Sequence, residues 1–345
     1  MKQRFRIVSL LCSGWMMLSA ASVPAATQPA SAEHGTPQML CLLDARLHCH
    51  AVDDGRELWA SDTAEAPGSL LLTQGRLWVT QSADLLEFEA STGQVLRRYA
   101  MPARLFTPRV SGDRLLLADA SGQLTALDMR SGDTLWRRRL SQRWVYPPAV
   151  EGARLYTGGA DGAVLALDQD KGRLLWRQDL GQELVYSPVL TAGRLWVPTF
   201  DGHLRGLEPA SGRILIDRRL ETPLFALSAE QGRLIGADYG GWLNAFDTES
   251  GRLLWRRRVA DRAPFDFELS APWLLAAAPS GAVQLLHADD GHTLKRLRFE
   301  PDDPGHAVIQ GSMVWLFPTK QSSQAGSLRP VGWPLPAEHS PGGEP

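Results

Sequence analysis

The sequence is short of several features that would define a function, and each shortage excludes a class of protein. Its 345 residues hold 36 Lys and Arg against 38 Asp and Glu, so the net charge is only −2. That balance gives no electrostatic reason to expect nucleic acid or an acidic membrane surface as a partner. Lysine itself is rare, and no basic block exceeds the Arg triplets at 137–139 and 256–258. We therefore expect no nucleic-acid partner.

Long apolar runs are missing except at the N-terminus. A positively charged start is followed by an apolar stretch over residues 7–21, which is too short to span a bilayer comfortably. Small residues at 23–25 fit a signal-peptidase site, so residues 1–25 are expected to be a signal peptide and 26–37 a linker. A cut after residue 32 and a retained anchor stay open. We expect a periplasmic protein whose mature chain does not span the membrane.

Cysteine is also scarce. Cys12 falls in the expected signal peptide, which leaves Cys41 and Cys49 in an oxidising compartment. The segment LCLLDARLHC looks like two strands around a tight turn, where opposed cysteines can be bridged if they are correctly oriented, so a disulfide is one of two open alternatives. His48 and His50 flank Cys49, but strand alternation puts the histidines on one face and Cys49 on the other. We therefore expect no metal site from these three residues.

Glycine, by contrast, is abundant and regularly spaced. Turn glycines recur every 38–40 residues at Gly55, Gly93, Gly132, Gly172, Gly212, Gly251 and Gly291. Two further turns repeat with the same period, one at Gly75, Gly112, Gly152, Gly193, Gly232 and Gly311, and one at Gly122, Gly162, Gly202, Gly241 and Gly281. Three turns in forty residues leave room for four short strands, which is one blade of a β-propeller. No convincing helical spacing interrupts this pattern in the mature chain.

The other recurring residues have architectural explanations. In the motif Asp-x-x-x-Gly, the glycine suits a turn position with positive φ, and the aspartate can accept backbone N–H bonds inside the turn. Four residues after the glycine, a tryptophan stands where it can pack against the neighbouring blade: Trp59, Trp136, Trp176 and Trp255. Ile216 takes that place in one degenerate repeat. The motif therefore describes a shape rather than a chemistry.

The repeat A-L-D-x-x-x-G-x-x-L-W resembles that of the pyrroloquinoline-quinone-like β-propellers over roughly residues 38–320. The resemblance implies an all-β propeller of four-stranded antiparallel blades in a domain at 38–320, with a disordered Pro/Gly-rich tail at 321–345. Seven signature turns favour seven blades. Eight stay open, because 312–318 looks like a further start and BamB-like members of the family have eight.

The family contains both quinoprotein dehydrogenases and non-catalytic BamB-like scaffolds of outer-membrane protein assembly. The dehydrogenase branch implies a disulfide between adjacent cysteines, Ca²⁺ ligands and long insertions, whereas this chain has no adjacent cysteines and uniform repeats. We therefore expect a non-enzymatic periplasmic interaction scaffold with no catalytic residues, no pyrroloquinoline quinone and no metal. Its expected partner is an envelope protein, such as a component of outer-membrane assembly. The alternative is a quinone-binding, dehydrogenase-like or small-ligand-binding propeller.

One feature exceeds what the repeat requires, because large side chains precede the innermost strand of successive blades where the family usually has small ones. Such positions lie at the mouth of the central channel. They can plug the channel, hold a small ligand or face a partner, and aromatic and arginine side chains are enriched at binding hot spots. The predicted partner-binding residues are Arg104, Phe106, Arg143, Trp144, Tyr146, Leu184, Tyr186, Phe225, Phe265 and Phe267.

Overall fold

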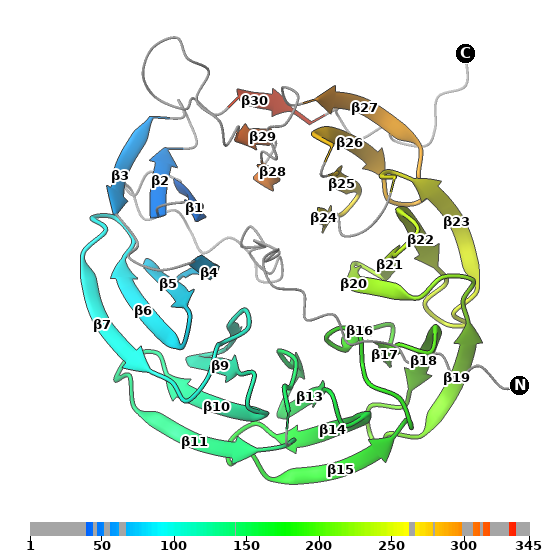
Figure 1. Cartoon of the computed structure of the whole chain (residues 1–345), viewed down its shortest axis with the longest axis horizontal. Helices are drawn as coiled ribbons and strands as arrows, with labels where there is room; N and C mark the ends of the chain where they lie inside the picture. Colours follow the sequence, from blue (N-terminus) through cyan, green and yellow to red (C-terminus); the bar gives the residue numbers. More distant parts are fainter. Residues whose placement is uncertain are drawn as a thin grey trace, which may run out of the picture.

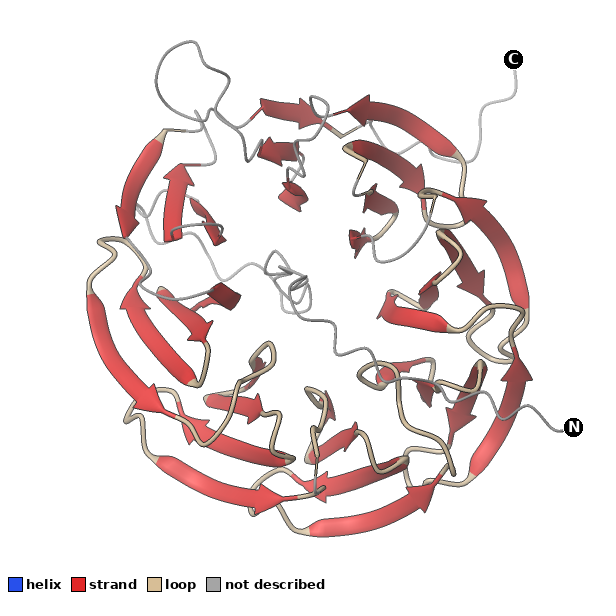
Figure 2. Cartoon of the chain, in the orientation of Figure 1, coloured by secondary structure: helices blue, strands red, loops and turns tan. Residues whose placement is uncertain are grey.

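The computed structural model describes residues 39–43, 47–51, 56–61, 67–141, 143–261, 266–278, 280–298, 306–310, 313–317 and 331–335. All regular secondary structure in these ranges is β-strand (Figure 2). The strands form eight antiparallel sheets, the blades, which follow one another around a ring (Figure 1). Within each blade the strands keep their chain order, with the first strand nearest the axis and the last at the outer rim.

Among the described residues, the first and last blades have three strands each, and the six between them have four. Blade 1 is β1 (Met39–Leu43), β2 (Leu47–Ala51) and β3 (Glu57–Ser61). Blade 2 is β4 (Pro67–Thr73), β5 (Arg76–Gln81), β6 (Asp84–Glu89) and β7 (Val95–Ala100), and blade 3 is β8 (Arg109–Ser111), β9 (Arg114–Ala118), β10 (Gln123–Asp128) and β11 (Thr134–Arg139). Blade 4 is β12 (Ala149–Glu151), β13 (Arg154–Gly158), β14 (Ala163–Asp168) and β15 (Leu174–Asp179).

The second half of the ring continues the series. Blade 5 is β16 (Val189–Thr191), β17 (Arg194–Pro198), β18 (His203–Leu207) and β19 (Ile214–Arg219), and blade 6 is β20 (Leu224–Glu230), β21 (Arg233–Asp238), β22 (Trp242–Phe246) and β23 (Leu253–Arg258). Blade 7 is β24 (Asp266–Ser270), β25 (Trp273–Ala277), β26 (Ala282–His287) and β27 (Thr293–Arg298). Blade 8 is β28 (His306–Gln310), β29 (Met313–Phe317) and β30 (Val331–Pro334).

The predicted all-β propeller of antiparallel blades is confirmed. All seven blades that the signature turn marks are present, and β28–β30 adds an eighth sheet that the sequence analysis left open. The signature does not mark this sheet, because no glycine stands 38–40 residues after Gly291. Strand β30 pairs with β29, which corrects the prediction of an unstructured tail from residue 321. The predicted signal peptide and linker lie outside the described residues.

A tryptophan of one blade is held by the signature turn of the next. Trp136 Nε1 donates a hydrogen bond of 2.9 Å to the Gln169 carbonyl, and a Cβ added to Gly172 would lie only 2.6 Å from the Trp136 ring. The same two contacts recur at three other joints, where Trp59 meets Ala90 and Gly93, Trp176 meets Pro209 and Gly212, and Trp255 meets Ala288 and Gly291. The turn glycine is therefore required twice, for its positive φ and for its missing side chain.

Two joints make this contact with other side chains. In blade 2, Arg97 replaces the tryptophan and donates to the Arg130 carbonyl at 2.9 Å, in the turn that contains Gly132. In blade 5, where Ile216 replaces it, the ring of Trp196 comes from β17 and lies 2.8 Å from the position of a Cβ on Gly251. The packing between blades therefore persists where the signature residue changes.

Carboxylates add further ties between the last three blades. Glu230 of β20 accepts a hydrogen bond from the Ala271 backbone N–H at 3.2 Å, and Glu268 of β24 accepts one from the Ile309 N–H of β28 at 2.9 Å. Burial raises the pKa of Glu268 to about 7, against the lowering effect of the Ile309 hydrogen bond and with a small addition from Glu230. The joint between blades 7 and 8 thus contains an acid that titrates near neutral pH.

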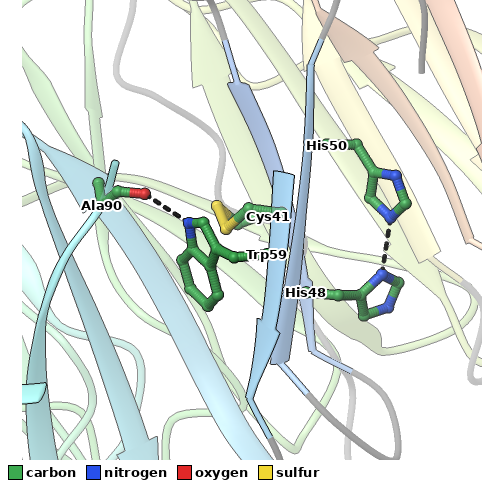
Figure 3. Close-up of a disulfide and its surroundings, with 6 residues drawn as sticks. Cys41, His48, His50, Trp59 and Ala90 are labelled. Atoms are coloured by element: carbon green, nitrogen blue, oxygen red, sulfur yellow. Dashed lines mark hydrogen bonds between the residues drawn. A yellow bond between two sulfur atoms is a disulfide. The ribbon is translucent and has the colours of Figure 1, made fainter. Parts of the chain in front are cut away.

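Blade 1 carries a cross-link. Cys41 and Cys49 are direct partners in the β1–β2 register and form a disulfide with a Cα–Cα distance of 4.1 Å. Both sulfurs belong to the buried cluster between blades 1 and 2. Figure 3 shows His48 and His50 on the opposite side of the strand from Cys41 and Trp59, as the alternation predicts. The two-strand interpretation of the cysteine segment is confirmed.

We predict that Gly172→Ala destabilises the fold more than Gly152→Ala. Both glycines have positive φ, 61° and 55°, so alanine costs about 1–2 kcal/mol at each. A Cβ at Gly152 meets nothing within 4 Å, whereas at Gly172 it overlaps the Trp136 ring and adds roughly 1–3 kcal/mol. Denaturant unfolding of the two variants measures the difference. Equal losses would mean that the ring is not seated on the turn.

A second prediction concerns Glu268. Its pKa is about 7 in the folded chain against an ordinary 4.5, so between these values the folded state keeps a proton that the unfolded chain has released. The unfolding free energy should therefore be highest below pH 4.5 and fall as pH rises to 7, by about 3 kcal/mol relative to Glu268→Gln. Chemical unfolding across this interval tests it, and parallel pH profiles for the two proteins would contradict it.

Candidate functional site

Chain direction sorts the loops of the propeller onto two faces. Because successive strands run in opposite directions, the connections between blades share one face with the turns between second and third strands. We call this side the connection face. Equivalent backbone hydrogen bonds join its turns to its connections in blades 3 to 6, from Ala120 to Arg104, Ala160 to Trp144, Phe200 to Glu183 and Tyr239 to Pro223.

Three of the predicted aromatics form a continuous row across blades 3 to 5. The ring centres of Phe106 and Tyr146 are 5.9 Å apart, and those of Tyr146 and Tyr186 are 6.4 Å apart. All three are partly buried against hydrophobic clusters between blades. Burial raises the pKa of the Tyr146 hydroxyl far above its usual range, although a hydrogen bond from Trp144 lowers it. This row mainly packs the blades together.

Other predicted partner residues belong to the core, which corrects their assignment. Leu184 is fully buried and Phe225 is 4% exposed, so neither offers surface to a partner. Phe267 is partly buried and packs on the same cluster as Phe225. Phe265 lies outside the described residues. For Leu184 and Phe225, filling the space between blades is the role that the structure supports.

Arg143 and Trp144 do reach the surface. The guanidinium carbon of Arg143 lies 4.1 Å from the centre of the Trp144 ring, and its Nη1 donates to Glu183 Oε1 at 2.5 Å. The side chains of Arg143 and Glu183 are 54% and 37% exposed, so this ion pair between neighbouring connections lies in solvent. These contacts orient the partly buried Trp144 ring without covering it. Arg104 repeats the arrangement more loosely, 5.7 Å from the Phe106 ring.

Two exposed aromatics were missed by sequence reasoning. Phe200 and Tyr239 are 47% and 48% exposed, and every other strongly exposed large apolar side chain among the described residues lies on an outermost strand. Both occupy the turn between second and third strands, where blades 3 and 4 have Ala120 and Ala160. The sequence could have revealed these two residues, because each is an aromatic at a position where other repeats have a turn alanine.

A buried network holds the turn that carries Phe200. Arg205 is 8% exposed and donates to Thr199 Oγ1 at 2.8 Å, to Asp217 Oδ2 at 3.1 Å and to Asp201 Oδ2 at 3.3 Å. Burial raises the pKa of Asp201, but the hydrogen bond from Thr199 and the charge of Arg205 outweigh it, so the pKa is lowered. The buried Arg205 therefore holds in place the turn that exposes Phe200.

The turn that carries Tyr239 is fixed by Asp238. This buried carboxylate accepts hydrogen bonds from Gly240 N at 2.9 Å, Trp242 N at 3.1 Å, Asn244 Nδ2 at 3.1 Å and Arg256 Nη2 at 2.9 Å. Because one oxygen binds the turn backbone and the other binds side chains of the following strands, the turn cannot shift independently of its blade.

Trp242 and Tyr239 complete this group of side chains. Arg256 lies 4.6 Å from the centre of the partly buried Trp242 ring and also donates to Glu221 at 2.8 Å. The Tyr239 ring packs edge-on against buried Phe225 at 5.6 Å. We call the set on blades 4 to 6 of the connection face the aromatic patch: Arg143, Trp144, Phe200, Tyr239, Trp242 and Arg256. Flat rings and guanidinium groups on a rigid base are suited to binding a protein surface.

Comparison with known proteins adds a family. The profile described as "Outer membrane protein assembly factor BamB" matches residues 43–143 and 120–217, which together span just over half of the chain. No curated protein matches the sequence.

Solved structures with a similar fold include both natural and designed proteins. The BamB structure from Moraxella catarrhalis is 19% identical over 82% of this chain and 96% of its own, with a TM-score of 0.63. The computationally designed Ika8 protein is 13% identical over 87% and 94% of the two chains, and Sqt1 from Saccharomyces cerevisiae is 12% identical over 86% and 93%, each with a TM-score of 0.71. At these identities the structures show the fold alone.

We predict that Trp144→Ala lowers the unfolding free energy less than Leu184→Ala does, because only Leu184 belongs to the core. Trp144 is partly exposed on a solvated ion pair, so its loss should cost less than about 1 kcal/mol of unfolding free energy. Leu184 is fully buried, and its loss should cost about 2–5 kcal/mol. Denaturant unfolding of both variants checks this, and a cost above about 2 kcal/mol for Trp144→Ala would place that ring in the core as well.

Proposed function

The chain belongs to the family of the outer membrane protein assembly factor BamB, and we propose that it is a non-catalytic scaffold that binds an envelope protein through the aromatic patch. The observation that carries the proposal is the exposure of Phe200 and Tyr239. They are the strongly exposed large apolar side chains that the described part of the chain places away from the outermost strands. Trp144 and Trp242 extend the same face.

The construction of the patch supports binding rather than core packing. Partner surfaces gain most from large anchors whose conformations are already fixed, because little side-chain entropy is then lost on association. Arg205 fixes the Phe200 turn and Asp238 fixes the Tyr239 turn, each from a buried position. The solvated Arg143–Glu183 pair adds charges at the rim of the patch, where they influence orientation and association rate more than affinity.

The proposed partner is a component of outer-membrane protein assembly, reached in the periplasm. Membership of the family of the outer membrane protein assembly factor BamB supports this choice, and the expected signal peptide at residues 1–25 would supply the export. None of the described residues forms a helix long and apolar enough to cross a membrane. The sequence also lacks the adjacent cysteines of the quinoprotein dehydrogenases, so the scaffold role is preferred over quinone-dependent oxidation.

The patch predicts a binding defect without a folding defect. We expect Trp144→Ala and Tyr239→Ala each to weaken capture of the partner by about 2 kcal/mol, close to 30-fold, while unfolding free energy changes by less than about 1 kcal/mol. The purified protein serves as bait in an envelope extract of the source organism, and mass spectrometry identifies what is recovered.

Leu174→Ala is the matched control, because Leu174 is 52% exposed but lies on the outer strand β15. It should recover the same proteins as the wild type. If the wild type enriches no outer-membrane assembly protein, the proposed partner is wrong. If it does so and both patch variants recover it equally well, the proposed surface is wrong.

A further inference from the structure

A histidine pair in blade 1 has no part in the proposed function. His48 and His50 are each 3% exposed, and His48 Nδ1 lies 2.8 Å from His50 Nε2 with the rings almost perpendicular. Glu57 of β3 is paired with His50 in the strand register. One ligand atom from each of the three lies within 4.8 Å of the other two. Two imidazoles and a carboxylate therefore converge on one point.

The two faces of this sheet have different roles. Cys49 and Trp59 pack against blade 2, and the disulfide and the Trp59–Ala90 hydrogen bond lie on that side (Figure 3). His48 and His50 project from the other side (Figure 3), and blade 8 is the other neighbour of blade 1 in the ring (Figure 1). Because Cys49 is held in the disulfide on the far face, its sulfur does not compete for this point. Glu57 supplies the third donor that the sequence analysis did not consider.

The spacing is close to that of a zinc centre. Zinc binds imidazole nitrogen at about 2.0–2.1 Å, so two ligand atoms of a tetrahedral site lie about 3.3 Å apart. The histidine nitrogens need only a small separation from their 2.8 Å to reach that distance. Glu57 is exposed, so its carboxylate can move inward by rotation of its side chain.

We propose that His48, His50 and Glu57 bind a divalent transition-metal ion, zinc foremost, at the joint where the first blade meets the last. Imidazole nitrogen is a ligand for zinc, copper and nickel, whereas calcium and magnesium prefer sites built from oxygen. Three protein ligands leave a fourth position for water. The ion takes the place of the His48–His50 hydrogen bond, and the ring that donated it changes tautomer: its proton exchanges through solvent to its other nitrogen, which frees the facing nitrogen to bind the ion.

This site has a structural task. The described joints from blade 1 to blade 7 are held by the tryptophan contacts and their substitutes, and the joint from blade 7 to blade 8 by Glu268. An ion bound between β2 and β3 fixes the third strand of blade 1 to the strand that the disulfide already fixes to β1. It therefore makes blade 1 a rigid end for the ring.

Zinc itself is the probe. The full chain, without a histidine tag and with Cys12→Ser so that no free thiolate competes, is titrated with Zn²⁺ by calorimetry, and its Tm is measured with and without the ion. We expect one equivalent to bind and Tm to rise, because the ion binds the folded state. Titration with Cu²⁺ followed by electron paramagnetic resonance should report two nitrogen ligands.

Three variants locate the site. Glu57→Gln changes an exposed side chain, keeps the fold and should weaken Zn²⁺ binding at least about 10-fold, and His50→Gln should abolish the one-equivalent binding. His292→Gln, at an exposed histidine in the turn before β27, should leave binding unchanged. Less than half an equivalent bound by the starting protein, or unchanged affinity in Glu57→Gln, would overturn the proposal even if His50→Gln fails to fold.

Discussion

The seating of a tryptophan ring on a glycine of the next blade is the contact on which the ring of blades depends. The missing Cβ lets the indole approach the turn backbone, and the hydrogen bond from Nε1 to a carbonyl fixes its orientation within the joint. Because the contact recurs at the repeat spacing, every blade meets its neighbour at a similar depth. The connections and turns that carry the aromatic patch consequently emerge at regular positions on one face. The patch is a product of this regularity.

The joints also show which part of that contact is dispensable. Arg97 keeps a hydrogen bond to the next turn with a flexible cation, whereas Trp196 keeps the flat ring. The Trp196 Nε1 has no hydrogen-bond partner among the described residues, and the hydrogen bonds to that turn come from Arg194 and Arg218 instead. Since both joints persist, contact with the turn glycine is the common requirement, and the hydrogen bond adds direction to it. The loss of the signature tryptophan at Ile216 is therefore compensated by the ring of Trp196, and it does not indicate a functional surface at this blade.

The fold could be predicted because the turns of the repeat contain residues with strong backbone preferences. A turn glycine at the repeat spacing marks each signature-bearing blade, an aspartate precedes it in three of them, and the period then leaves room for the strands. Blade 8 has no such turn, so only the apolar segment around β29 pointed to it. Strand β30 is four residues long and includes Gly332 and Pro334, both depleted in strands, which is why the tail prediction failed there.

The site could be predicted only in part, because the repeat places a residue on a connection without deciding whether its side chain points inward or outward. Counting forty residues matches Leu184 to Trp144, but the backbone bridges to Thr199 and Gly159 match Leu184 to Val145 instead, and both of these side chains are buried. Phe200 and Tyr239 lie on turns between second and third strands, whereas the predicted partner residues all lie on the connections between blades. Glu57 lies on a different strand from the histidines and joins them only through register, which is a property of the folded sheet.

The face opposite the aromatic patch has a character of its own. Its turns between first and second strands contain Gly112, Gly152, Gly193 and Gly232, and a Cβ built on any of them meets nothing within 4 Å. Exposed turn tips of this kind are where inserted sequence is best tolerated. The propeller can therefore be used as a two-sided disc, with a reporter, an epitope or a second module grafted into these turns. Such an attachment would leave the face with Phe200 and Tyr239 unobstructed, and the thickness of the blades would set the distance between the two.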